Sequence, residues 1–285
     1  MIAIVDYQKG NLKSVERGLI AAGGEAFITA DASEIAKADA IVLPGVGAFA
    51  DAAATMCELG QMEAIRDRVR AGVPFLGICL GEHLMFEHGV EGAPEGNPAC
   101  GLGLLPGTVV AMPRCDAQGK AFKVPHVGWN TIEISACSGG GKAVAVTPCG
   151  EGGGNAVLSS GGAGGGAARS SAAKRGLFEH GASPGSAPQV GSELAFPDST
   201  PQPESNLAFA CPLFDGIAPG EYFYFTHSYI APTGPHTIAE TTHSTRFTSA
   251  VQFGERAFGV QFHPEKSSDA GARVLANFVA IAARG

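Results

Sequence analysis

Short apolar runs alternate with helical segments through the first 80 residues, and this alternation limits the possible folds more than any other feature of the chain. The apolar run 40–43 ends at Pro44-Gly45, and the run 73–78 follows a helical segment that ends at Gly72. Such runs, joined by short links, are typical of a parallel sheet covered by helices on both faces. We therefore expect strands at 2–5, 25–29, 40–43 and 73–78, and helices at 12–22, 31–37, 48–59 and 61–71.

From residue 103 onward the pattern changes to strands with few helices between them. Expected strands lie at 108–112, 129–134, 222–225, 238–242, 249–253 and 258–262, before a last helix at 269–283. We interpret these strands as a mixed sheet that completes the same domain. The predicted fold class is α/β, with an open, mostly parallel or mixed sheet flanked by helices.

Residues 136–206 are rich in Gly, Ser, Ala and Pro. A segment of this composition cannot bury enough apolar surface to offset its chain entropy. We expect a single domain over residues 1–285 that is interrupted by a flexible surface insertion at about 136–206. A regulatory or partner-binding arm is the alternative, and nothing in the sequence favours it.

Composition excludes several classes of function. The net charge is −8 and no lysine or arginine run occurs, which argues against nucleic acid as the main partner. The apolar run Ile2–Val5 is too short for a signal peptide, and no run approaches bilayer length, so we expect no membrane association. The 7 cysteines are irregularly spaced without a CxxC pair. This spacing argues against a disulfide framework or a zinc site and favours a reducing cytoplasm. We expect no metal and no cofactor.

The strongest local motif is Gly77-Ile78-Cys79-Leu80-Gly81, which follows an apolar strand. We expect the helix after it to continue through Leu84, Met85 and Phe86. This is the arrangement of a nucleophile elbow, in which glycines permit a sharp turn and close approach of strand and helix. The unpaired N–H groups of the helix start favour the thiolate, and the N–H of Leu80 points toward the oxygen of an attacked carbonyl. A buried cysteine between packing glycines is the alternative reading.

A base for this cysteine is expected at His263-Pro264-Glu265, directly after the apolar strand 258–262. Catalytic groups gather at the carboxyl ends of strands in open α/β sheets. Glu265 is suited to orient the imidazole and to stabilise its charged form. The alternative is a solvent-exposed turn. The chain order Cys, His, Glu differs from the nucleophile, acid, histidine order of α/β-hydrolases, which makes a cysteine hydrolase of that fold the weaker interpretation.

A second glycine-rich turn, Gly45-Val46-Gly47, follows the strand at 40–43. As a dinucleotide fingerprint it is weak, because the acidic residues about 20 positions on lie inside a predicted helix. A backbone N–H from this turn is better suited to complete an oxyanion hole with Leu80. Because glycines permit peptide flips, that donor is a candidate switch. A plain packing turn is the alternative.

Six stretches together resemble the class I, or triad, glutamine amidotransferases, whose fold is flavodoxin-like. More particularly, they resemble the glutaminase subunits of imidazole glycerol phosphate synthase. The stretches are IVDY with GNL and SV at 4–15, LPGVGAF at 43–49, PFLGICLG at 74–81, KVPHVGWN at 123–130, YFYFTHSY at 222–229 and FGVQFHPEKS at 258–267.

The resemblance implies that Cys79, His263 and Glu265 form a triad that releases ammonia from glutamine through a thioester. The ammonia would pass to a (β/α)8-barrel cyclase subunit in a heterodimer. That subunit makes imidazole glycerol phosphate and aminoimidazole carboxamide ribotide in histidine biosynthesis. Residues at the glutamine site would include Gly47, Gly81 and His83.

The resemblance also places Asn11 and Trp129 near the cyclase interface; for Trp129, simple core packing is the alternative. The chain departs from the family at three positions. Glu82 and His83 stand where Met and Gln are usual, and Gln8 replaces a usual Gly. Two other functions therefore stay open: a non-catalytic amidotransferase scaffold, and a class I amidotransferase that serves another acceptor.

Overall fold

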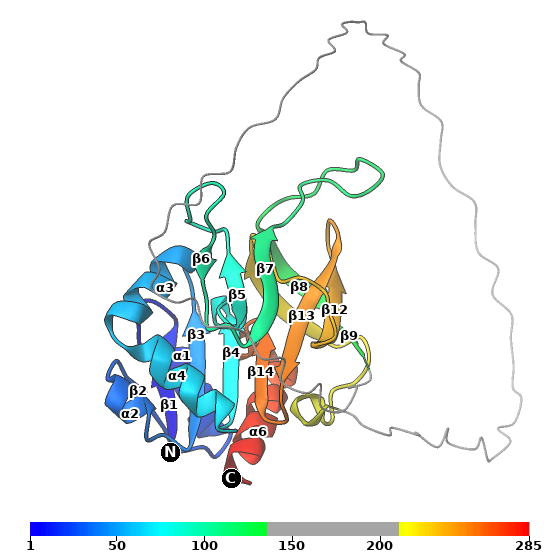
Figure 1. Cartoon of the computed structure of the whole chain (residues 1–285). Helices are drawn as coiled ribbons and strands as arrows, with labels where there is room; N and C mark the ends of the chain where they lie inside the picture. Colours follow the sequence, from blue (N-terminus) through cyan, green and yellow to red (C-terminus); the bar gives the residue numbers. More distant parts are fainter. Residues whose placement is uncertain (136–210, 285) are drawn as a thin grey trace, which may run out of the picture. The chain divides into compact units, whose positions relative to one another are not determined.

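The computed structural model describes residues 1–135 and 211–284 (Figure 1). The insertion predicted at 136–206 lies outside the described residues. Within the described part of the chain, no helix is both long and apolar enough to cross a bilayer.

The main sheet has eight strands, and its first half is parallel, as the sequence predicts. Its order is β2 (Ala26–Thr29), β1 (Ile2–Val5), β3 (Ala40–Gly45), β4 (Phe75–Cys79), β14 (Ala257–Val260), β13 (Arg246–Phe253), β12 (Thr237–Thr242) and β9 (Glu133–Ile134). The pairs from β2 to β14 are parallel, and those from β14 to β9 are antiparallel. The carboxyl ends of β3, β4 and β14 therefore meet at one edge of the sheet.

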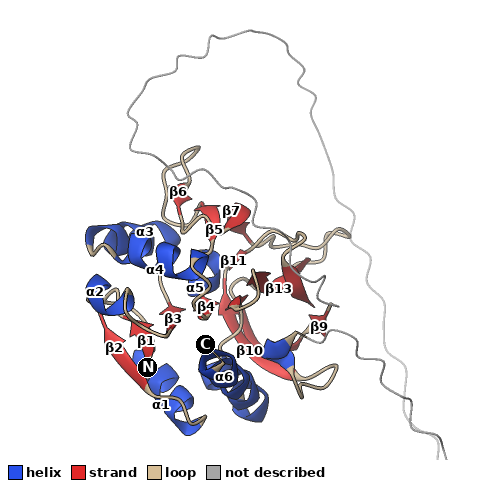
Figure 2. Ribbon diagram, turned by 60° about the horizontal axis from the view of Figure 1, so that its bottom comes forward, coloured by secondary structure: helices blue, strands red, loops and turns tan. Residues whose placement is uncertain are grey.

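Helices cover both faces of the parallel half (Figure 2). Alternate residues of a strand point to opposite faces, and β1 divides accordingly. Ile2 and Ile4 belong to the core beneath α1 (Leu12–Ala21) and α6 (Ser268–Ala283), whereas Ala3 and Val5 belong to the core on the other face. That second core is closed by α2 (Ala32–Ile35), α3 (Phe49–Glu58) and α4 (Gln61–Arg70). The prediction of a sheet buried on both sides is confirmed.

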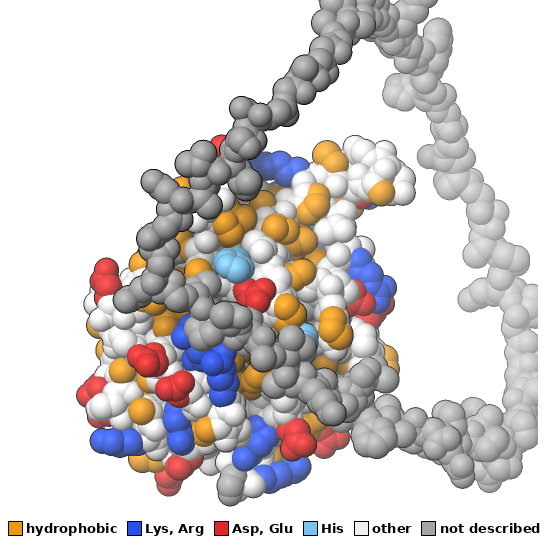
Figure 3. Space-filling view, viewed as in Figure 1, with side chains coloured by type: hydrophobic (Ala, Val, Ile, Leu, Met, Phe, Trp, Pro, Cys, Tyr) orange, Lys and Arg blue, Asp and Glu red, His pale blue; other side chains and the backbone are white. Residues whose placement is uncertain are grey.

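The expectation that the later strands complete one mixed sheet is confirmed for β14, β13, β12 and β9 and wrong for the others. Strands β8 (His126–Thr131) and β10 (Tyr222–His227) form a separate antiparallel pair. A four-stranded sheet has the order β11 (Tyr229–Ile230), β7 (Leu105–Ala111), β5 (Phe86–Gly89) and β6 (Ala99–Cys100). Phe223 and Phe225 of β10 are fully buried in the core shared with α6, so this pair packs on the main sheet. Hydrophobic side chains gather over β5 and β7, and charged ones over α2 and α4 (Figure 3).

The expected helix through residues 84–86 is also wrong. Helix α5 (Leu80–His83) is a single turn, and β5 begins at Phe86. The carbonyls of Leu84 and Met85 accept hydrogen bonds from the backbone N–H groups of Leu102 and Leu104. The chain leaves the helix after one turn, and these non-local bonds satisfy the two carbonyls instead.

Candidate active site

The backbone turns sharply at Cys79, where β4 ends and α5 begins. Cys79 has φ 54° and ψ −105°, a conformation that residues with a side chain rarely adopt. A Cβ on Gly77 would lie 2.5 Å from the carbonyl oxygen of Gly81, and one on Gly81 would lie 1.8 Å from that of Leu43. No residue but glycine fits at either position. The turn leaves the sulfur at the carboxyl edge of the sheet.

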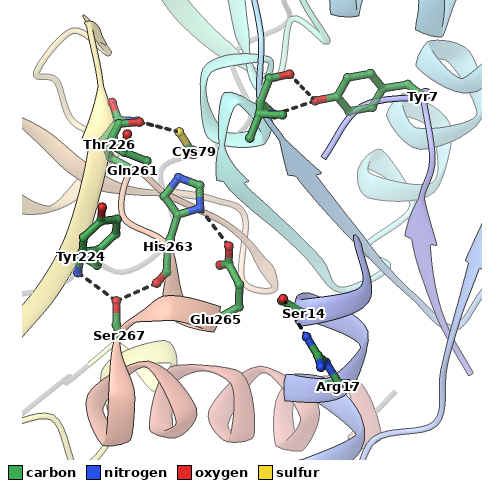
Figure 4. Close-up of polar contacts among 11 residues, drawn as sticks. Tyr7, Ser14, Arg17, Cys79, Tyr224, Thr226, Gln261, His263, Glu265 and Ser267 are labelled. Carbon is green, nitrogen blue, oxygen red and sulfur yellow. Dashed lines mark hydrogen bonds and ion pairs between the residues drawn. The ribbon is translucent and has the colours of Figure 1, made fainter. Parts of the chain in front are cut away.

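His263 reaches the same edge from the neighbouring strand. Strand β14 pairs in parallel with β4, with Val260 opposite Ile78, so the residues after both strands emerge together. The Nδ1 of His263 lies 3.0 Å from Oε1 of Glu265, and both side chains are almost fully buried. Nε2 is turned toward the sulfur of Cys79 (Figure 4), and it makes no hydrogen bond of ordinary geometry within the described residues. The structure thus brings these three predicted side chains together.

Ser267 fixes the backbone of His263. Its hydroxyl donates to the carbonyl of His263 at 2.6 Å and accepts from the N–H of Tyr224 at 2.9 Å. The N–H of His263 donates to the carbonyl of Tyr224, also at 2.9 Å. The base is therefore tied to β10, and sequence reasoning missed both of these anchoring residues.

The pKa of His263 reflects its partners. Burial lowers this pKa, but interactions with Cys79 and with the carboxylate of Glu265 outweigh burial and raise it to about 9. Opposite charges close to an imidazole favour its protonated form. The arrangement therefore supports an imidazolium at neutral pH, facing the sulfur.

Two further groups contact the sulfur. The carbonyl oxygen of Thr226 lies 3.9 Å from Sγ of Cys79, and Nε2 of Gln261 lies 3.8 Å from it. The Oε1 of Gln261 is bonded in turn to Nε2 of His83 at 2.7 Å. Burial lowers the pKa of His83 to about 4, so its imidazole is neutral at pH 7. Gln261 was not predicted as a site residue. The only sequence signal for it is its position two residues before His263.

The predicted oxyanion turn lies beside the elbow. Gly45 pairs with Cys79 across β3 and β4, and a Cβ on it would lie 2.8 Å from the Cβ of Leu80. The next peptide is held by Tyr7. The Val46 N–H donates to the hydroxyl of Tyr7 at 3.1 Å, and that hydroxyl lies 3.4 Å from the Val46 carbonyl (Figure 4). The Val46 N–H can therefore reach an oxyanion only after this contact is released.

A cavity of about 430 Å³ lies in front of the sulfur. Its size suits a small polar substrate. Of the predicted glutamine-site residues, Gly47 and His83 line it, whereas Gly81 does not. The lining residues are Val46, Gly47, Ala48, Cys79, Leu80, His83, Glu91, Pro125, Thr226, His227, Ser228 and Tyr229.

The two predicted interface residues have different surroundings. Asn11 is half-buried at the N-cap of α1, where its side chain makes no capping hydrogen bond. Trp129 on β8 is 50% exposed and meets Tyr224 edge to face. Core packing of this tryptophan is therefore excluded.

Glu82 is a buried carboxyl group behind the nucleophile. It is fully buried, and neither of its oxygens has a hydrogen-bond partner within the described residues. Burial, and then the charge of Cys79, raises the pKa of Glu82 well above its usual range. The folded state consequently favours the protonated acid, whereas the unfolded chain releases the proton at ordinary acidic pH.

We predict that Glu82→Met stabilises the protein by about 1–3 kcal/mol at pH 7.5, because an unpartnered buried polar group is removed. The gain should be smallest below about pH 4.5, where only the burial of the unpartnered group contributes, and grow as the pH rises, since the unfolded chain then loses this proton and the folded one does not. Urea unfolding at pH 5 and pH 8 measures it. Glu58→Met, at an exposed position on α3, is the control and should change stability by less than about 0.5 kcal/mol. A destabilised Glu82→Met protein at pH 7.5 contradicts this account.

We also predict that the imidazole of His263 titrates near pH 9 and that this pKa falls in Cys79→Ala and in Glu265→Gln. Each substitution removes an interaction that raises the pKa and leaves the lowering by burial in place. NMR of histidine-labelled protein measures the titration, and the signal is assigned by its loss in His263→Gln. A neutral imidazole at pH 7.5 in the unmodified protein is the contrary result.

Comparisons with known proteins agree with this geometry. The model of class-I glutamine amidotransferases matches residues 191–282, and that of CobB/CobQ-like glutamine amidotransferase domains matches residues 12–133. A crystal structure of a glutamine amidotransferase superposes with a TM-score of 0.55 at 15% identity, covering 99% of this chain and 98% of that one. The PurLQS structure from Thermotoga maritima gives a TM-score of 0.53 at 14% identity, covering 98% and 97%. These structures share the fold.

Similarity in sequence is higher to two curated relatives, both called imidazole glycerol phosphate synthase subunit HisH. The one from Rhodopirellula baltica is 34% identical over 280 residues, covering 98% of this chain and 96% of the relative. The one from Moorella thermoacetica is 34% identical over 279 residues, covering 97% and 93%. The chain therefore belongs to the HisH family, the glutamine amidotransferase subunits of imidazole glycerol phosphate synthase.

Proposed function

We propose that this chain hydrolyses glutamine to glutamate and ammonia with Cys79 as nucleophile, His263 as acid and base, and Glu265 as the orienting carboxylate. The observation that carries the proposal is that a buried His–Glu pair faces the sulfur of Cys79 at a cavity on the carboxyl edge of one sheet. We also propose that residues 1–285 form one glutamine amidotransferase domain with an insertion at about 136–206.

The first step forms a thioester. The thiolate of Cys79 attacks the γ-carboxamide carbon of glutamine, and the carbonyl oxygen becomes an oxyanion. The N–H of Leu80 stabilises it, with a second donor from the turn Gly45-Val46-Gly47. The imidazolium of His263 then gives its proton to the leaving nitrogen, the C–N bond breaks, and ammonia departs.

The second step restores the enzyme. The neutral imidazole of His263 takes a proton from a water molecule, whose oxygen attacks the thioester carbon. The C–S bond breaks, glutamate leaves and the thiolate–imidazolium pair is regenerated. In sum, one glutamine and one water give one glutamate and one ammonia. Glu265 stays ionised throughout and keeps the imidazole in the orientation that both transfers need.

Glutamine is proposed to occupy the cavity in front of the sulfur, with Gly47, Gly81 and His83 among the residues around it. Gly81 acts through its backbone within the elbow, since it does not line the cavity. His83 is one of two departures from the family beside the nucleophile, and its neutral imidazole retains one donor and one acceptor.

The partner is proposed to be a (β/α)8-barrel cyclase subunit, bound as a heterodimer. It would use the ammonia to make imidazole glycerol phosphate and aminoimidazole carboxamide ribotide. Val127, Trp129 and Tyr222 on the paired strands β8 and β10 are each at least half exposed, which supports a binding face there. Asn11 is assigned to the same interface, and the cytoplasm is the proposed location.

Replacing the nucleophile separates the release of ammonia from glutamine from the use of ammonia by the cyclase. We predict that Cys79→Ala lowers glutamine-dependent turnover of the complex by at least about 10³-fold, because no thioester forms. Ammonium chloride should still support the cyclase. The assay measures product formation with purified cyclase and its nucleotide substrate. Cys57→Ala, at an exposed position on α3, is the matched control. Full glutaminase activity in Cys79→Ala would refute the proposal, and failure of the unmodified protein to release ammonia at saturating glutamine would favour the scaffold function.

Releasing Val46 from Tyr7 should raise the activity of the isolated subunit. We predict that Tyr7→Phe increases glutaminase turnover without the cyclase by about 2- to 10-fold, since a neutral hydrogen bond contributes about 0.5–1.5 kcal/mol. Burial raises the pKa of Tyr7, so the hydroxyl stays protonated at working pH and can donate to the Val46 carbonyl while it accepts from the Val46 N–H. Release of ammonia is measured with and without the substitution. Tyr222→Phe, at an exposed position, should leave the rate unchanged; an unchanged or slower Tyr7→Phe subunit contradicts the role given to Val46.

A further inference from the structure

A chain of three side chains ends at the nucleophile. The imidazole of His83 bonds the carboxamide of Gln261 at 2.7 Å, and the same carboxamide places its Nε2 3.8 Å from the sulfur of Cys79. Gln261 is 0% exposed and His83 is 3% exposed, so water has little access to either contact. The Gln261 backbone is fixed as well, since its N–H donates to the carbonyl of Ser249 at 3.0 Å.

The orientation of the Gln261 carboxamide depends on which atom His83 presents. A carboxamide has an oxygen that accepts and an NH₂ group that donates. When Nε2 of His83 carries its hydrogen, it donates to Oε1 of Gln261, and the NH₂ group is left to face the sulfur. The opposite tautomer would draw the NH₂ group to His83 and turn Oε1 toward the sulfur. Only the first arrangement stabilises a thiolate.

The other neighbours of the sulfur make this donor important. The carbonyl of Thr226 accepts a hydrogen bond from a thiol but offers nothing to a thiolate. His263 faces the sulfur, but its proton is given to ammonia during turnover. In the described part of the chain, Gln261 therefore supplies the donor to the sulfur that is not itself consumed in the reaction.

We propose that His83 and Gln261 are positioning residues for the nucleophile: His83 holds the Gln261 carboxamide with its NH₂ group on the sulfur of Cys79, which favours the thiolate and fixes its direction. This inference rests on the proposed function, because it assumes that Cys79 reacts as a thiolate. It assigns to His83 a role that does not require contact with glutamine.

The test is the pH dependence of Cys79 alkylation by iodoacetamide, followed by mass spectrometry of the peptide that contains it. Alkylation needs no glutamine and no partner, so its result is independent of whether the chain is a glutaminase. His83→Phe removes the donor to Gln261, and Gln261→Met removes the donor to the sulfur at nearly constant volume. The midpoint of alkylation should rise by about 0.5–1 pH unit in each, as expected for one lost hydrogen bond to a charged group.

The double variant tests the order of the contacts. Since the two residues act in series, His83→Phe with Gln261→Met should shift the midpoint no further than Gln261→Met alone. His83→Gln retains an N–H donor and should restore the midpoint of the unmodified protein. If His83→Phe does not fold, His83→Asn, whose amide is too short to reach Gln261, takes its place with the same expected shift.

Other titratable groups lie near His83, Gln261 and Cys79. Charge on the sulfur acts on His263, Glu82 and Tyr7, and His83 acts on His227. The effects of the sulfur are common to all variants, and Gln261→Met, which keeps His83, leaves the effect of His83 on His227 unchanged. Unshifted midpoints in both single variants would overturn the proposal, and so would shifts that add in the double variant. A raised KM for glutamine with an unshifted alkylation midpoint would mean that His83 only contacts substrate.

Discussion

The site depends on one steric constraint, the close packing of the elbow against the neighbouring strand. Cys79 holds a positive φ because the turn is clamped between Gly77, Gly81 and the carbonyl of Leu43. A side chain on either glycine would overlap backbone atoms, which have no room to move within a sheet buried on both faces. The strain at Cys79 is therefore maintained by the parallel core beneath it, and the sulfur projects beyond the sheet edge as a consequence.

The base reaches the sulfur through a second constraint, the parallel pairing of β4 with β14. The register of this pair sets where along the sheet edge His263 follows β14. Ser267 and Tyr224 then fix its backbone. Tyr224 lies on β10, directly opposite Trp129 of β8 in the antiparallel pair. The proposed partner face thus includes the strand that holds the backbone of the proposed base. A shift of β10 on binding would act on His263 through these backbone hydrogen bonds, and also on the substrate cavity, which Thr226 and His227 of β10 line.

The sequence predicts the features that local pattern governs. Apolar runs with short links predict the parallel half of the sheet, and the motifs at residues 77–81 and 263–265 predict a cysteine facing a His–Glu pair. Features set by distant hydrogen bonds were missed. Helix α5 ends after one turn, and the carbonyls of Leu84 and Met85 then bond the distant Leu102 and Leu104. The contacts of Tyr7 with Val46, and of Gln261 with the sulfur, join segments 39 and 182 residues apart, and neither leaves a local signature.

The titratable groups around the sulfur are all buried, and the contacts of each one decide whether it favours its charged or its uncharged form. Burial keeps His83 neutral with a pKa of about 4, and it raises the pKa of both Tyr7 and Glu82, so these three groups favour their uncharged forms. His263 is buried as well, yet its pKa rises to about 9 because Glu265 and Cys79 face its two ring nitrogens. Among the described groups around the sulfur, His263 is therefore the one that favours its charged form at neutral pH. The position of Glu265 thereby decides which histidine carries the proton that the chemistry requires.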